Sequence, residues 1–396
     1  PLGFAVTLES SPLGTGHEPD IASGLPVRRL TDLPDTQFFF PYFTNNPFPQ
    51  PDQVLCFGEP VGADAGEPVP RTLYIADLGS DELRQVSQPV ESKNLWMAIC
   101  GLVAARDGKR AFWAVDDRLL AVDLTDGTVE EIYRSPKGWS MGQSNCTAAG
   151  DVFSVGEVSD DFMNSSPKPE GYTMDAAARA WPEPAGRIVL VDTTRAEARV
   201  VHEVRGVPTH VNVHPENPNL VLYCHEGHWS YVGHRIWLLD VEAGEAEPIC
   251  VPPDGYALGH ETWTEDGRVL FHGASLCLRP EDRPEGDAPL ECLIGVGLPT
   301  GEIERLVIDR RMRWGLPHVS MSSDGQWIVT AGQWARDFVW VARWGDDTLE
   351  PRIVAAHHGE GAGVVCPRFF PDGSSVVFTG LRGDTSQLYS VGLADG

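Results

Sequence analysis

The chain has little positive charge and no long apolar run. Its 396 residues include 30 lysines and arginines against 57 aspartates and glutamates, which gives a formal net charge of −27 at pH 7. A protein that binds nucleic acid is expected to present a basic face to the phosphates. No apolar stretch approaches the roughly 20 residues of a membrane-spanning helix. We therefore expect no nucleic-acid partner and no membrane partner, and we interpret the acidic excess as a solubilising surface.

Paired cysteines are also lacking, and the N-terminal residues of this sequence do not have the pattern of a signal peptide. The eight cysteines are widely spaced, no Cys-x-x-Cys occurs, and most lie inside apolar runs such as Leu-Val-Leu-Tyr-Cys at 220–224. Such cysteines are typical of reduced core thiols, so we predict a cytoplasmic protein. The first ten residues have neither the charged nor the apolar region of a signal peptide. Because the chain does not begin with methionine, the sequence leaves open whether a leader was removed earlier.

Two catalytic signatures are missing as well. No Gly-x-Ser-x-Gly occurs, so the nucleophile elbow of a hydrolase is unsupported. The glycine-rich stretch 359–363 has neither the lysine nor the strand–loop–helix setting of a phosphate-binding loop. These absences argue against a serine hydrolase and against a nucleotide-binding protein.

Turn residues, in contrast, are abundant. The 41 glycines and 32 prolines are scattered, which favours many short strands over long helices. Asp-Gly turns that precede a strongly apolar segment, such as Arg-Ala-Phe-Trp-Ala-Val, occur at 105–109, 264–268, 322–326 and 370–374. Asp-Gly between apolar alternations is a strong hairpin signal.

These turns belong to an internal repeat. Four strands recur in cycles of about 45–50 residues, the length of a β-propeller blade. We count seven cycles, which start near residues 37, 94, 139, 206, 256, 313 and 362. The last cycle lacks a fourth strand, and we expect Val-Arg-Arg-Leu-Thr-Asp at 27–32 to complete it, because closure removes exposed edges. The predicted fold is an all-β, seven-bladed β-propeller over residues 27–396, its ring closed by an N-terminal strand in the last blade, with an N-terminal extension at 1–26.

Two insertions interrupt the repeat, at about 158–185 and 279–290. The first contains a short helix-like segment, Met-Asp-Ala-Ala-Ala-Arg-Ala, and the second is rich in proline, glutamate and aspartate. Insertions on one rim of a propeller often shape a binding site.

Three histidines occupy the same place in successive repeats. His210, His260 and His318 each open a strand-like run and precede a turn. In a propeller they would point into one central funnel, where imidazoles can transfer protons or bind a metal. The alternative is that each histidine bonds to the backbone of a neighbouring blade.

One segment is distinctive enough to indicate a family. Residues 223–240, Tyr-Cys-His-Glu-Gly-His-Trp-Ser-Tyr-Val-Gly-His-Arg-Ile-Trp-Leu-Leu-Asp, resemble the oligogalacturonate lyase family, as do Pro-Tyr-Phe-Thr-Asn-Asn-Pro-Phe at 41–48 and Gly-His-Glu-Thr-Trp-Thr-Glu-Asp-Gly at 259–267. Members of that family are seven-bladed propellers that cleave short pectic uronides by β-elimination. The resemblance covers most of the chain and implies a lyase that acts on a uronic-acid-containing oligosaccharide.

The resemblance also implies roles for individual residues. His210 would be the base, and Arg187 would be the cation that assists the carboxylate or the leaving-group oxygen. His260 matches the first ligand of the family's Mn²⁺ site. His225 and Arg235 are candidates for substrate binding and, equally, for stapling two strands of one blade.

The remainder of that metal site departs from the family. The family's Gln-x-x-His-x-His-Pro cluster falls here on residues 361–367, where Gly361, Val364 and Cys366 replace the three ligands. One imidazole and water would not retain Mn²⁺ firmly.

Two outcomes follow for the metal. Either the divalent metal is lost and arginines of the run 310–313 offset it, or His260 and His318 hold it together with Cys366. A thiolate would shift the preference from Mn²⁺ toward Zn²⁺. The altered site also leaves open a non-catalytic propeller that binds a carbohydrate or a protein partner, and a related enzyme recruited to another glycosidic bond.

Overall fold

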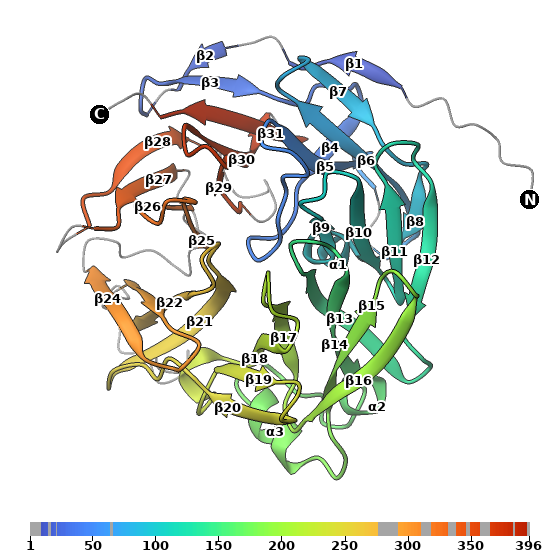
Figure 1. The fold of residues 1–396 in the computed structure, drawn as a ribbon, viewed down its shortest axis with the longest axis vertical. Coiled ribbons are helices and arrows are strands. Elements are labelled where there is room, and N and C mark those ends of the chain that lie inside the picture. The colour runs from blue at the N-terminus through green and yellow to red at the C-terminus, as the bar shows by residue number, and fades with distance from the viewer. Residues whose placement is uncertain are drawn as a thin grey trace, which may run out of the picture.

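Seven antiparallel sheets surround a centre in the computed structural model, which confirms the predicted all-β, seven-bladed propeller (Figure 1). The structure describes residues 9–14, 17–20, 22–63, 66–275, 292–309, 318–331, 338–345, 349–356, 365–382 and 385–393. The predicted insertion at 279–290 lies outside this range.

The first four blades follow one another along the chain. Blade one contains β1 (Ser10–Pro12), β4 (Thr36–Phe39), β5 (Gln53–Pro60), β6 (Val69–Asp77), β7 (Glu82–Gln85) and β8 (Val90–Ser92). Blade two contains β9 (Leu102–Ala104), β10 (Arg110–Val115), β11 (Arg118–Asp123) and β12 (Val129–Arg134). Blade three contains β13 (Trp139–Cys146), β14 (Val152–Ser159), β15 (Gly186–Asp192) and β16 (Glu197–Val204). Blade four contains β17 (Pro208–Val213), β18 (Leu220–His225), β19 (Ile236–Asp240) and β20 (Glu245–Pro248).

The last three blades complete the ring. Blade five contains β21 (Tyr256–Trp263), β22 (Val269–Ser275), β23 (Cys292–Gly297) and β24 (Ile303–Asp309). Blade six contains β25 (His318–Met321), β26 (Trp327–Ala331), β27 (Phe338–Arg343) and β28 (Arg352–Ala356). Blade seven contains β29 (Arg368–Phe369), β30 (Ser375–Arg382), β31 (Thr385–Gly392), β3 (Pro26–Arg29) and β2 (His17–Pro19).

An N-terminal strand closes the ring, as the sequence predicts. Strand β3 pairs with β31, with Val27 opposite Val391. The segment that precedes it also contributes edge strands, because β2 pairs with β3 and β1 pairs with β7 of blade one. The N-terminal segment thus contributes strands to both the first and the last blade.

The four predicted Asp-Gly turns connect the first and second strands of blades two, five, six and seven. Their glycines all have φ between +69° and +80°, and they are Gly108, Gly267, Gly325 and Gly373. Glycine adopts this left-handed conformation without the steric cost that a Cβ brings. The turns therefore return the chain directly into the apolar second strand of each blade.

The hydrophobic core lies between adjacent blades, since each sheet buries both of its faces. Between blades two and three, for example, the rings of Phe112 and Phe153 lie 5.8 Å apart inside one cluster of buried residues. Comparable clusters separate blades three and four, four and five, five and six, and six and seven. This packing fixes each first strand at the rim of the centre.

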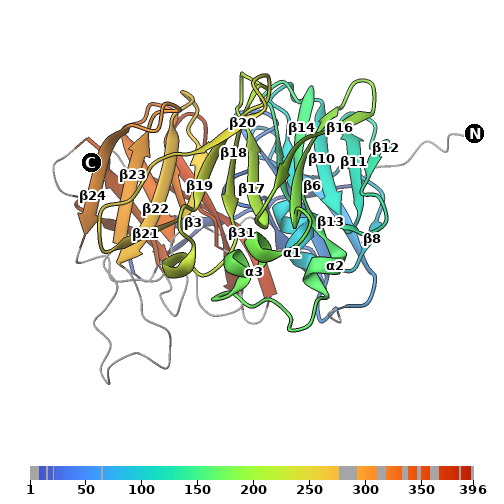
Figure 2. The ribbon, with the colours of Figure 1, turned by 90° about the horizontal axis from the view of Figure 1, so that it is seen from below.

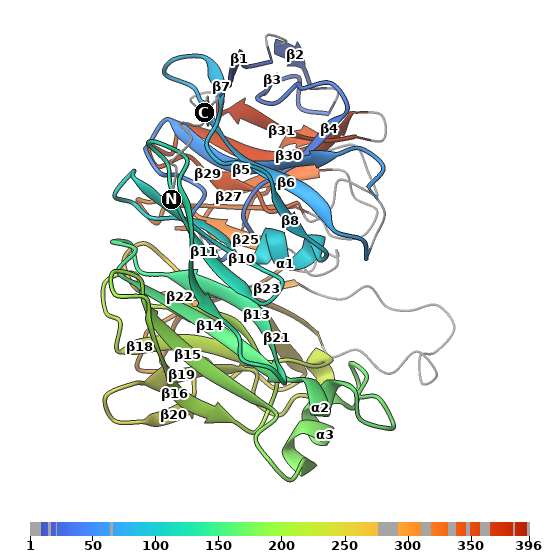
Figure 3. The same ribbon diagram turned by 90° about the vertical axis from the view of Figure 1, so that its right-hand side faces the viewer.

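The three α-helices of the described residues lie on one face of the disc (Figures 2 and 3). The predicted helix of the insertion at 158–185 is α3 (Met174–Ala180), which follows the short α2 (Asp160–Met163). Helix α1 (Leu95–Cys100) stands where the sequence predicts the first strand of a blade, and the side chain of Asn94 caps it by accepting from the Met97 amide. A 3₁₀ turn, η1, spans Trp229–Tyr231. None of the helices in the described residues has the length and apolarity that crossing a bilayer requires.

Candidate active site

Irregularities in the innermost strands aim two of the predicted histidines at the centre. In β17 the pairing register shifts between Thr209 and Asn212, and in β21 it shifts between Gly259 and Glu261. The bulged histidines have positive φ angles, 48° at His210 and 39° at His260. Non-glycine residues rarely adopt such angles, and β-bulges re-aim side chains in this way.

The bulge at His210 is supported from blade three. The backbone amide of His210 donates to Oε1 of Gln143 at 2.8 Å. Gln143 itself lies in a stretch of β13 where the register shifts. The amide that loses its ladder partner at the bulge is thus satisfied by a buried side chain.

The three histidines predicted from the repeat do come together. The ring centroids of His210 and His260 are 5.4 Å apart, and those of His260 and His318 are 4.6 Å apart. A fourth imidazole, that of His272 on β22, lies 4.7 Å from His260. We did not predict His272, although a histidine inside the apolar segment Val-Leu-Phe-His-Gly was the available signal.

Two aromatic residues fill the centre between these imidazoles. The connection between β4 and β5 reaches into the ring (Figure 1), and its Phe43 stacks on His318 with centroids 4.9 Å apart. The hydroxyl of neighbouring Tyr42 lies 3.1 Å from Nε2 of His318, while Nδ1 lies 3.3 Å from the carbonyl oxygen of Val365. A metal ion at His318 would therefore have to displace one of these two partners.

Burial keeps the inner histidines neutral. It lowers the pKa of His260 and His272 well below the usual value, and neighbouring imidazoles add to the effect. Burial likewise lowers the pKa of His318 to about 3. Nδ1 of His260 and both ring nitrogens of His272 are buried and have no hydrogen-bond partner among the described residues.

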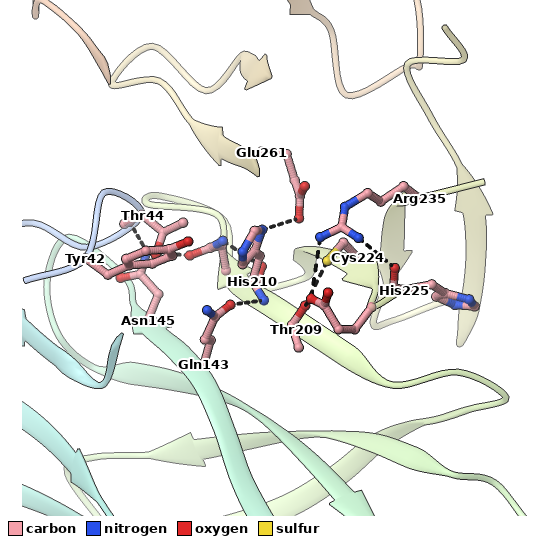
Figure 4. Close-up of polar contacts among 12 residues, drawn as sticks. Tyr42, Thr44, Gln143, Asn145, Thr209, His210, Cys224, His225, Arg235 and Glu261 are labelled. Carbon is pink, nitrogen blue, oxygen red and sulfur yellow. Dashed lines mark hydrogen bonds and ion pairs between the residues drawn. The ribbon is translucent and has the colours of Figure 1, made fainter. Parts of the chain in front are cut away.

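His210 faces a carboxylate of blade five. Its Nδ1 lies 3.1 Å from Oε1 of Glu261, whose side chain is fully buried (Figure 4). The other oxygen of Glu261, Oε2, has no partner among the described residues. Ligand atoms of His210, Cys224 and Glu261 all lie within 4.8 Å of one another. Burial raises the pKa of the Cys224 thiol well above its usual value.

Arg235 supplies positive charge beside this pair (Figure 4). Its guanidinium donates to the carbonyl oxygens of His225 at 3.3 Å and Gly227 at 3.1 Å, and it lies 3.5 Å from a carboxylate oxygen of Glu226. Burial alone would lower the pKa of Arg235, but neighbouring anionic groups raise it above the usual value. Its Nε has no partner among the described residues.

His225 is occupied in fastening α3 to blade four. Its Nδ1 lies 3.3 Å from a carboxylate oxygen of Asp175 on α3, and its ring stacks on Trp237 at 4.8 Å. In Figure 4 the imidazole points away from His210. Of the two roles predicted for His225, the geometry favours the structural one.

Arg187, which the resemblance implies as the assisting cation, is held by a carboxylate of its own blade. It donates to Glu157 at 2.6 Å, and the other oxygen of Glu157 accepts from Tyr133 of blade two at 2.7 Å. Successive residues of a strand face opposite sides of the sheet. A Cβ at Gly186, the neighbour of Arg187, would meet Pro208 of blade four. Arg187 therefore faces blade two, whereas Gly186 faces blade four.

Several predicted metal and cation positions lie outside the described residues. These are Gly361 and Val364, together with the arginines of 310–313. Cys366 is described, and burial raises the pKa of its thiol. It is part of the apolar cluster that joins blades seven, one and two.

Comparison of the chain with known proteins identifies a family that it resembles. A family model described as oligogalacturonate lyase matches residues 12–279. An oligogalacturonide lyase of Pectobacterium atrosepticum is 24% identical over 253 residues, which are 64% of this chain and 62% of that protein. An oligogalacturonate lyase of Dickeya dadantii is 24% identical over 254 residues, with the same two coverages of 64% and 62%. The match thus spans less than two thirds of these relatives' length.

Solved structures share the fold over nearly the whole chain. An oligogalacturonate lyase in complex with manganese has a TM-score of 0.78 at 20% identity, with 98% of both chains covered. An oligogalacturonate lyase from Vibrio parahaemolyticus has a TM-score of 0.76 at 19% identity, again with 98% of both chains covered. At such identities the likeness shows the propeller alone. The family model, however, covers more than half of the chain, and the chain therefore belongs to the oligogalacturonate lyase family.

Proposed function

We propose that this protein is a lyase that cleaves a uronic-acid-containing oligosaccharide by β-elimination, with His210 as the base. The observation that carries the proposal is the buried contact of 3.1 Å between His210 and Glu261 at the centre of the propeller. Membership of the oligogalacturonate lyase family and the names of the curated relatives support the substrate class. The buried cysteines of the described residues form no disulfide with one another, which supports a cytoplasmic location.

The reaction needs a base and a stabiliser of negative charge. A proton next to a uronate carboxylate is a weak acid, so its removal requires a base of near-neutral pKa and a cation that stabilises the enolate-like transition state. If Nδ1 of His210 carries a proton, Glu261 accepts it in a hydrogen bond. The lone pair of Nε2 then remains for the substrate. His210 would take the proton from the carbon next to the carboxylate, and the electrons of that C–H bond would form the double bond while the bond from the next carbon to the sugar oxygen breaks. The departing oxygen would take up a proton from the imidazolium or from water.

Arg235 is the cation that we place closest to this base. Its side chain lies beside Cys224 and Glu261 (Figure 4), and its Nε–H, which has no partner among the described residues, can donate to a substrate carboxylate. Arg187, which is held by Glu157 and lies 4.0 Å from the ring of Trp139, would assist from the rim instead.

A divalent metal is implied by the manganese in the solved relative. His260 offers one free nitrogen, whereas both nitrogens of His318 have protein partners. The compact donor group that the described residues do provide contains the thiol of Cys224, which suits Zn²⁺ better than Mn²⁺. The described residues do not fit the family's Mn²⁺ site, and we assign no step of the reaction to that metal.

An assay with short uronides separates a lyase from a carbohydrate-binding propeller. The protein is incubated with oligogalacturonates and other uronides, with and without EDTA, and the ultraviolet absorbance of unsaturated products is followed. The proposal predicts product from at least one substrate. Calorimetric binding without product across the whole panel would favour the non-catalytic alternative and overturn the lyase assignment.

A further inference from the structure

We propose that His210, Cys224 and Glu261 form a binding site for a thiophilic divalent cation such as Zn²⁺, and that its occupancy blocks His210. The resemblance to the family implies Mn²⁺ ligands at His260 and within 361–367, and none of the three residues of the present site is among them. The inhibition of His210 by the bound cation rests on the proposed function, whereas the binding of the cation does not.

Three rigid strands of two blades present the ligands. His210 lies on β17, Cys224 on β18 and Glu261 on β21. Cys224 stands directly opposite Thr209, the residue before His210, in the pairing of β17 and β18. Positions on paired strands hold ligands in place more firmly than loop positions do.

The distances suit a small cation. All three ligand atoms lie within 4.8 Å of one another. A point no farther than about 2.8 Å from all three must then exist, so shifts of less than about 1 Å give bonds near the 2.0–2.3 Å of zinc sites. Imidazole, thiolate and carboxylate leave a fourth position of a tetrahedron for water.

An unpartnered atom points to a ligand at this place. Oε2 of Glu261 is buried without a hydrogen-bond partner among the described residues, in a side chain with no exposed surface. A buried carboxylate oxygen normally has a partner, because leaving it unpaired costs free energy. A cation would provide that partner.

The charges nearby can accept a dication. A thiolate at Cys224 and the carboxylate of Glu261 neutralise two positive charges. Arg235 would repel the cation, but it lies 3.5 Å from the carboxylate of Glu226, which offsets its charge. The thiol selects against Mn²⁺ and Mg²⁺, which prefer oxygen ligands.

Binding at this site would remove the base. A neutral imidazole that gives one nitrogen to a metal carries its proton on the other nitrogen. His210 then has no lone pair for the substrate proton. We therefore expect Zn²⁺ to inhibit product formation and EDTA to restore it.

Cobalt reports on the thiolate directly, since a cysteine bound to Co²⁺ gives a near-ultraviolet charge-transfer band. The full-length protein is titrated with Co²⁺ alone, and so are Cys224→Ala, Glu261→Gln and the control Cys56→Ala, which removes another buried strand cysteine. We expect a band that saturates at one equivalent in the parent and in the control. The band should be lost in Cys224→Ala, and Co²⁺ affinity should fall at least tenfold in Glu261→Gln. Circular dichroism checks that each variant is folded.

The results distinguish whether the cation site exists from whether its occupancy inhibits cleavage. No band in the folded parent, or a band that persists in Cys224→Ala, overturns the site. If the band appears but Zn²⁺ does not inhibit uronide cleavage, only the proposed inhibition is overturned. If the protein cleaves no uronide, the proposed function fails, but the cobalt band still decides whether the site exists.

Discussion

His210 and Glu261 lie in neighbouring blades, and their side chains meet with 3.1 Å between Nδ1 and Oε1. The contact depends on bulges in two strands, because each bulge shifts the register just where its side chain must point to the centre. A carboxylate at Nδ1 fixes the ring orientation and the tautomer of a histidine base. The proposed function therefore depends on this pair more than on any other contact.

Replacing Glu261 with glutamine should reduce kcat while KM changes little. The amide keeps the size of the side chain but loses the charge that stabilises the imidazolium formed during proton transfer. We expect a loss of about 10²-fold or more, the usual range for disabling a general base. Steady-state kinetics on a cleavable uronide provide the measurement.

The control for this variant is Glu226→Gln, which changes a nearby carboxylate that does not contact His210. It should retain more activity than Glu261→Gln. Equal losses in the two variants would mean that overall charge, rather than the contact with His210, matters.

Replacing Tyr42 with phenylalanine should destabilise the fold modestly. The ring packing is kept, but the hydroxyl 3.1 Å from Nε2 of His318 is lost. We expect a loss of about 1 kcal/mol in the free energy of unfolding, or somewhat more if the imidazole nitrogen stays unpaired. Urea unfolding of Tyr42→Phe, His318→Gln and the double variant measures the coupling. Strictly additive effects would show that the two side chains do not interact.

Acidification should weaken the fold before the carboxylates titrate. The unfolded chain protonates a histidine near pH 6.5, whereas folded His318 has a pKa of about 3. The unfolded state therefore binds more protons throughout this interval, and stability is full above about pH 6.5 and falls as the pH is lowered. One such histidine contributes a slope of about 1.4 kcal/mol per pH unit. Burial of His260 and His272 acts in the same direction.

Urea unfolding of the parent and of His318→Gln between pH 7 and pH 5 tests this expectation. The variant should lose stability less steeply, since one neutral buried histidine is gone. Identical slopes would indicate that His318 is protonated in the folded protein.

Replacing His225 with alanine should loosen α3 more than it affects catalysis. The imidazole contacts Asp175 of α3 and stacks on Trp237, so its removal takes away the link between helix and blade. We expect a stability loss of about 1–3 kcal/mol and faster proteolysis within the insertion at 158–185. Asp175→Asn should show the same proteolytic change. A large rise in KM with unchanged proteolysis would instead support substrate binding by His225.

The propeller could be predicted because its signals are local. Asp-Gly turns and apolar second strands repeat with the blade, and the edge strand at 27–32 lacked a partner of its own. Helix α1 was missed because its signal is short: Asn94 caps only six residues before the first strand of blade two.

The site could be predicted only in part. The repeat predicts that His210, His260 and His318 lie close together. The bulges, and the residues of other blades that contact these histidines, are set by tertiary packing. Glu261 was overlooked as a partner because nothing in its own strand shows that it faces His210 of another blade. Arg187 faces blade two because side chains alternate along a strand, and a shift of one residue reverses the face.

The role of His210 as the base can be tested by comparing the parent protein with a variant that lacks the imidazole. Parent protein and His210→Asn, both shown to be folded by circular dichroism, are assayed on the same short galacturonate oligomers for the ultraviolet absorbance of unsaturated product. We predict that the parent forms product and that the variant is slower by about 10²–10⁴-fold. A variant as fast as the parent would contradict the assignment of His210 as the base.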